Sequence, residues 1–106
     1  MNELKIHAEP SKEFLEELNR LTEDNNHGLV YERIAEWCQS ESMGCDKEAY
    51  EEFNLFRKLF HTMNQFHKRM GYFNHGDLRY EVGKRMRETC ARVFGQKVAA
   101  QIDAAC

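Results

Sequence analysis

Proline and glycine are scarce in this sequence, with one proline and six glycines among its 106 residues. Residues that break helices therefore interrupt the chain at few points. The middle of the chain is instead rich in Leu, Glu, Lys, Arg, Met and Phe, and most of these residue types are good helix formers. The composition favours a helical protein.

Long apolar runs are absent as well. No stretch of 18 apolar residues occurs, which excludes a membrane-spanning helix. Residues 1–10 lack the basic patch and apolar stretch of a secretory signal. The four cysteines, at positions 38, 45, 90 and 106, admit three disulfide pairings. Because a helical core of this size is stable without disulfide bonds, we expect the thiols to be reduced, as in a cytoplasmic protein. We expect no membrane partner.

Chain length and polarity indicate one globular unit. A chain of 106 residues matches the usual size of one domain. Apolar residues make up 42% and charged residues 31%, which is typical of a globular rather than a disordered chain. We predict a single domain over residues 1–106, in which residues 1–10 form an extended arm or a frayed tail.

The spacing of apolar residues predicts an all-α fold, a compact bundle of four main helices plus a short C-terminal helix. The expected helices run from Ser11 as N-cap to about Asp24, from about Leu29 to Ser42, from Asp46 as N-cap to about Met70, from Asp77 as N-cap to Phe94, and from Gln96 to Ala105. Asn25–Gly28 is the predicted first break, and Gly44 suits the left-handed position after the second helix.

The third predicted helix carries the strongest pattern. Seven of its residues recur at alternating spacings of four and three, as in a heptad seam: Ala49, Phe53, Phe56, Phe60, Met63, His67 and Met70. The apolar stripe is widened by Leu55, Leu59, Phe66 and Phe73. We therefore expect this helix to be central and covered on more than one side, with His67 hydrogen-bonded inside a helical interface.

Motifs for catalysis are lacking. The sequence has no glycine-rich phosphate loop and no His-Glu-x-x-His zinc motif. Six residues separate Cys38 from Cys45, whereas structural zinc sites favour two to four. His75 and Asp77 bracket Gly76 like a base and its orienting carboxylate, but no serine or cysteine lies nearby as a nucleophile. We predict a non-enzymatic protein with no catalytic residues, no metal site and no cofactor.

Charge is divided unevenly along the chain. Residues 1–56 carry a net charge of −9 and residues 57–106 a net charge of +6. Either the two halves pack together and neutralise each other, or the basic half meets an electrostatic partner. The predicted partner-binding residues are Lys68, Arg69, Arg79, Lys84, Arg85, Arg87 and Arg92.

These observations predict a small protein that binds another macromolecule, most readily a protein, and regulates or inhibits it. Polarised charge accelerates and orients docking more than it adds affinity. Small accessory proteins of phages and mobile elements often fit this description. A homodimer is compatible with the sequence, because a second copy offers an acidic half to the basic one.

The alternative is a dimeric DNA-binding regulator, which uses either the basic C-terminal half or an N-terminal ribbon. The alternating residues Leu4–Ala8 resemble the strand of ribbon-helix-helix repressors, and Val30–Ile34 is similar to the second helix of some members. The resemblance covers about 40 residues and implies that two strands pair across a dimer and face Lys5 and His7 toward DNA. The serine-containing start of the family's second helix is replaced here by Asn26-His27-Gly28.

Overall fold

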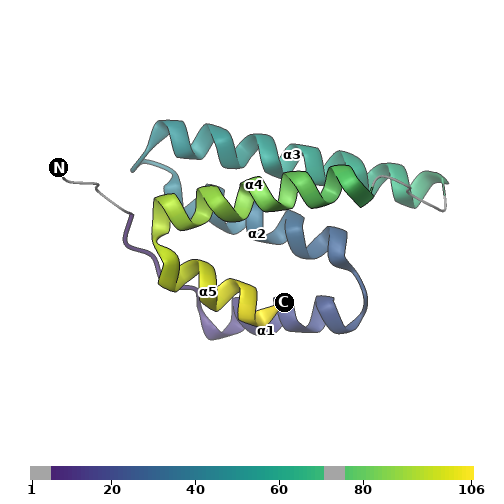
Figure 1. Cartoon of the computed structure of the whole chain (residues 1–106), viewed down its shortest axis with the longest axis horizontal. Helices are drawn as coiled ribbons and strands as arrows, with labels where there is room; N and C mark the ends of the chain where they lie inside the picture. The colour runs from purple at the N-terminus through teal and green to yellow at the C-terminus, as the bar shows by residue number, and fades with distance from the viewer. Residues whose placement is uncertain (1–5, 71–75) are drawn as a thin grey trace.

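The computed structural model describes residues 6–70 and 76–106, and it confirms the predicted all-α bundle. Five helices follow one another: α1 Lys12–Glu23, α2 His27–Ser42, α3 Lys47–Met70, α4 Gly76–Phe94 and α5 Gln96–Ala105. No strand occurs in the described ranges. Figure 1 shows α3 and α4 running side by side along the long axis, with α5 folded back over α1.

The central helix is α2, which packs against α1, α3 and α4 and shares the most extensive interface of the bundle with α3. Three small side chains on α2, those of Ala35, Cys38 and Ser42, are fully buried and let neighbouring helices approach closely. The prediction that the third helix is central was wrong. Its heptad residues are buried from Ala49 to Met63 and α3 packs against both α2 and α4, but Leu55 remains 55% exposed on its outer side.

Local side-chain bonds fix the helix starts that the sequence predicted. Ser11 accepts a hydrogen bond from the Phe14 amide at 3.1 Å, and Asp46 accepts one from the Ala49 amide at 3.1 Å. Each bond satisfies an amide that the helix itself leaves without an acceptor. The predicted left-handed residue after α2 is also confirmed, since Gly44 has a φ of 82°.

Two predicted boundaries were wrong by one or two residues. α2 begins at His27 rather than Leu29, because Asn25, with a φ of 63°, makes the turn and Gly28 lies within the first helical turn. α4 begins at Gly76, which places Asp77 inside the first turn rather than at the N-cap. The predicted stripe residue Phe73 lies outside the described residues, and so does His75, one member of the pair His75 and Asp77.

Aromatic rings join four helices in the core. The Trp37 ring of α2 stacks on Phe14 of α1 with centroids 5.3 Å apart, and its other neighbour is Phe94 of α4 at 5.5 Å. Phe94 in turn stacks on Phe53 of α3 at 5.8 Å. Because each ring buries a large apolar area, this cluster ties α1, α2, α3 and α4 together.

The described part of the N-terminal arm is extended and packs on its own chain. The Ile6 amide donates to the Val93 carbonyl oxygen at 2.9 Å, and Ala8 and Pro10 are buried. Residues 6–10 form no strand, so the paired ribbon is not present there, and Leu4 and Lys5 lie outside the described residues. Residues 6–10 do not form a frayed tail either, because they pack on the bundle.

Candidate binding surfaces

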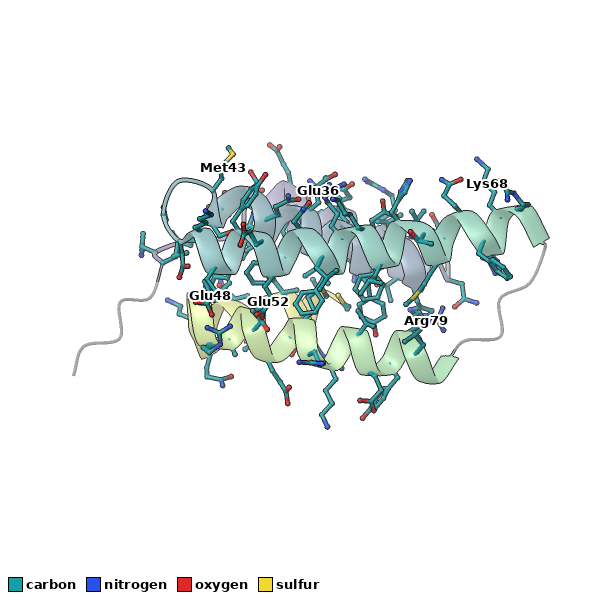
Figure 2. All side chains as sticks on the ribbon, turned by 90° about the horizontal axis from the view of Figure 1, so that it is seen from above. Glu36, Met43, Glu48, Glu52, Lys68 and Arg79 are labelled. Carbon is teal, nitrogen blue, oxygen red and sulfur yellow. The ribbon has the colours of Figure 1, made fainter. Side chains whose placement is uncertain are left out.

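The predicted partner-binding residues lie on two helices. Lys68 and Arg69 end α3, and the other five lie along α4. Figure 2 shows Lys68 and Arg79 at the same end of the molecule, opposite the end that carries Glu48. Basic side chains are not confined to that end, because Arg92 lies beside Glu52 near the start of α3.

Two of these basic side chains are engaged within the bundle. Arg92 pairs with Glu52 across the α3–α4 interface at 3.3 Å. Glu52 also accepts a hydrogen bond from Thr89, and Figure 2 shows it between the two helices. Arg87 reaches the Tyr31 hydroxyl at 3.5 Å and stands 5.9 Å from that ring's centroid. These contacts join α4 to α3 and α2.

Four other basic residues are exposed and form no ion pair with any residue in the described ranges: Lys68, Arg69, Lys84 and Arg85. We call this set the basic surface. Direct ion pairing between the two halves of the chain is thus limited, within the same ranges, to Arg92–Glu52 and to the contact of His61 with Glu32 at 2.9 Å. The predicted neutralisation of one half by the other is therefore only partial.

Apolar side chains are exposed on the same two helices. Leu78 is 49% exposed and Tyr80 60% exposed on α4, and Leu55 is 55% exposed on α3. Protein interfaces are enriched in aromatic residues and arginine relative to the remaining surface. The combination of free cations with exposed apolar groups is thus the composition expected of a docking surface.

A separate cavity of about 310 Å³ opens where the start of α2, the end of α3 and the start of α4 meet. Its lining consists of Asn25, Asn26, His27, Gly28, Phe60, Met63, Asn64, His67 and Arg79. Arg79 is half-buried here, and no residue of the basic surface lines this cavity. We call this feature the Arg79 cavity.

The position of His67 corrects a prediction. Its side chain is exposed at the Arg79 cavity and is not hydrogen-bonded to any described residue. The heptad spacing placed it correctly on the inward face of α3, but α3 extends past the helices that would cover that position (Figure 1). Sequence reasoning did not single out Asn64, and it took Asn25–Gly28 only as a helix break.

The cysteines are free thiols, as predicted. Cys38 and Cys90 are buried, while Cys45 and Cys106 are exposed. Burial raises the pKa of Cys38 well above its usual range, and a hydrogen bond with the Cys90 thiol makes a smaller contribution in the same direction. Burial also raises the pKa of Cys106, with a further contribution from Asp103. Since the thiolate is the reactive form, both side chains are weak nucleophiles at neutral pH.

Metal-binding clusters and membrane-spanning helices are both absent from the described residues. Residues 6–70 and 76–106 hold no cluster of three or more His, Cys, Asp or Glu side chains arranged around a common metal position. None of the helices in these ranges combines the length and the apolar character needed to cross a bilayer.

Comparison with known proteins gives no match. No family model fits the chain, and no curated protein or solved structure is similar to it. The class is therefore defined by fold alone, an all-α bundle with five helices in residues 6–70 and 76–106.

Proposed function

We propose that the protein is a non-enzymatic binding protein that docks on an acidic surface of another protein and regulates or inhibits it. The observation that supports this proposal is the basic surface, whose four cations lack an ion-pair partner in the described ranges. The proposed place of action is the cytoplasm, where the four free cysteines would stay reduced.

The two kinds of exposed group would have separate roles in docking. Unpaired cations attract an acidic partner over a distance of about 8–10 Å at physiological salt, so they raise the association rate and orient the encounter. Leu78 and Tyr80, which are exposed on α4, would then lose water on contact and lengthen the lifetime of the complex. The acidic end of α3 would repel a partner that docks in the reverse orientation.

An acidic protein fits this arrangement better than duplex DNA. The chain has a pI near 5.9, whereas domains that bind nucleic acid nonspecifically are usually basic overall. The described part of the N-terminal arm is hydrogen-bonded to Val93 and does not pair as a ribbon. DNA binding through the basic surface stays the alternative that the experiment must distinguish.

The test reverses charge on the basic surface. We expect Lys84→Glu combined with Arg85→Glu to weaken binding of the partner isolated from native extract by at least about tenfold, a loss of about 1.4 kcal/mol. The matched control is Lys12→Glu with Lys47→Glu, which makes the same change in net charge at exposed positions that begin α1 and α3. Affinities are measured by calorimetry with the purified partner.

Three results would contradict the proposal. The first is unchanged affinity in the Lys84/Arg85 variant, and the second is an equal loss in the Lys12/Lys47 control. The third is binding to duplex DNA that falls steeply as salt rises, which would favour the nucleic-acid alternative. Light scattering on the same samples decides whether the free protein is a monomer or a homodimer.

A further inference from the structure

The Arg79 cavity has an unusual lining, because all of its described ionisable side chains are basic. Arg79, His27 and His67 line it, and the side chains that the structure describes around it include no carboxylate. On α2, the Glu32 carboxylate is engaged by His61 at 2.9 Å and by the Asn64 amide at 2.6 Å. Among the described lining residues, Arg79 therefore has no carboxylate to pair with.

Arg79 faces inward rather than outward. It lies three residues before Val82 and seven before Met86, both of which are buried, so it shares the core-facing side of α4. Figure 2 shows its side chain on the side of α4 that faces α3. It is half-buried and makes no ion pair or hydrogen bond with a described residue. A cation in such a position is stabilised when an anion accompanies it.

The lining of the Arg79 cavity is mostly polar. Phe60 and Met63 are buried and supply its apolar part. A mostly polar lining suits a charged ligand that makes hydrogen bonds better than an apolar one. A tight packing fixes this lining, since Asn64 also donates to the Gly28 carbonyl oxygen at 3.2 Å.

Hydrogen-bond donors complement the charge. The Arg79 guanidinium offers a planar fork that matches two oxygens of a phosphate group. The His27 ring is oriented by its contact with the Asn25 side-chain oxygen, Nε2 to Oδ1 at 3.1 Å. Asn26 begins α2 without a side-chain bond to the first turn, so amides of that turn also remain open at the cavity.

We propose that the Arg79 cavity binds a small molecule through a phosphate group, with Arg79 as its principal partner and His27 and His67 beside it. The volume of about 310 Å³ lies at the lower end of the range of about 300–1,000 Å³ found for small-molecule sites. It suits inorganic phosphate or a compact phosphate monoester. This proposal is independent of docking through the basic surface, because none of Lys68, Arg69, Lys84 and Arg85 lines the cavity.

The experiment titrates the full chain with two probes, inorganic phosphate and glycerol 3-phosphate, against sodium chloride at equal ionic strength. We expect amide NMR shifts to change at Asn25–Gly28, Asn64, His67 and Arg79 with either phosphate and not with chloride. Arg79→Gln should weaken this binding by at least about tenfold. Arg85→Gln, which removes the same charge from the outer side of α4, should leave it unchanged.

Thermal stability gives a second readout that separates binding from folding. A ligand that binds only the folded state raises the midpoint of unfolding in a concentration-dependent manner. We expect phosphate to stabilise the parent chain and Arg85→Gln but not Arg79→Gln. The Arg79→Gln variant should still fold in the absence of phosphate, because the substitution removes the half-buried charge. Tighter binding of the monoester would identify an esterified phosphate as the ligand, and equal affinity would identify the phosphate group alone. Absence of localised shifts, or equal losses in both variants, would overturn the proposal.

Discussion

At the scale of single residues, Gly83 is a glycine that the bundle does not require. It lies inside α4 with ordinary helical φ, and a Cβ built there would meet the nearest Tyr31 ring carbon at 3.4 Å, an ordinary contact. Alanine is favoured over glycine within helices by about 0.8–1.0 kcal/mol. We predict that Gly83→Ala raises the free energy of unfolding by about 0.5–1 kcal/mol, as measured by urea denaturation followed by circular dichroism.

Gly44 provides the matched control. It has open space around it but a φ of 82°, where an L side chain is strained. The same change, Gly44→Ala, should lower the free energy of unfolding by about 1 kcal/mol. Loss of stability in Gly83→Ala would show that α2 and α4 approach more closely at Tyr31 than the structure indicates.

Residue roles that act within a few positions could be predicted from the sequence, and roles that depend on distant contacts could not. Ser11 and Asp46 were recognised as N-caps because each bonds an amide three residues ahead. The glycine requirement at Gly28 escaped prediction, because a Cβ there would collide with Asn64, which is 36 residues away. That collision depends on how α2 and α3 dock.

At the scale of helices, the stability of α1 depends on its N-cap residue, Ser11. α1 has 12 residues and Ser11 supplies its only side-chain cap among the described contacts. Replacement of a serine N-cap by alanine costs about 1 kcal/mol, whereas asparagine keeps an acceptor in place. We predict that Ser11→Ala lowers the free energy of unfolding by about 1 kcal/mol and that Ser11→Asn retains it, measured by chemical denaturation.

A different pair of results would reject the capping role of Ser11. If the alanine and asparagine variants lose stability equally, the serine contributes through something other than its acceptor oxygen. If neither loses stability, the first turn of α1 is not needed to hold that helix against α2 and α5, the two helices it contacts.

Helix identity was predictable, but the order of importance among the helices was not. Apolar spacing gave all five helices, because side-chain periodicity is set by each helix alone. The same reasoning ranked α3 first, since it carries the longest apolar pattern. The structure instead centres on α2, whose small buried residues Ala35 and Cys38 give a weak hydrophobic pattern and close packing.

At the scale of the whole molecule, stability depends on rings that α3 directs inward. Phe53 is fully buried and stacks on Phe94, whereas Leu55, two positions along the same helix, is 55% exposed. Removal of a buried phenylalanine ring costs about 3–5 kcal/mol. We predict that Phe53→Ala loses about that amount and that Leu55→Ala stays within about 0.5 kcal/mol of the parent, measured by thermal denaturation.

The comparison remains informative if Phe53→Ala fails to fold. In that case Phe53→Leu, which keeps most of the volume, should restore a cooperative transition with an intermediate loss of stability. A large loss in Leu55→Ala would contradict the structure, because it would mean that the outer side of α3 is covered in the free protein.

The sequence predicted the charge imbalance of the whole molecule but not where each charge lies. The sequence predicts one acidic and one basic half, but in the bundle Lys68 and Arg79 lie at one end, whereas Arg92 meets Glu52 toward the other (Figure 2). The inward position of Arg79 and its cavity could not be predicted. They require α2, α3 and α4 to meet at one end, and His27, His67 and Arg79 are far apart in sequence.

Trp37, which stacks on Phe14 and lies tilted against Phe94, gives the protein an intrinsic fluorescent probe. Trp37 is the only tryptophan in the chain, so its fluorescence comes from a single place where α1, α2 and α4 meet. Because Trp37 is only partly buried, detachment of either outer helix would increase the contact of the indole with water and shift its emission to longer wavelength. The separation of α1 or α4 from the bundle would thus be visible in unlabelled protein.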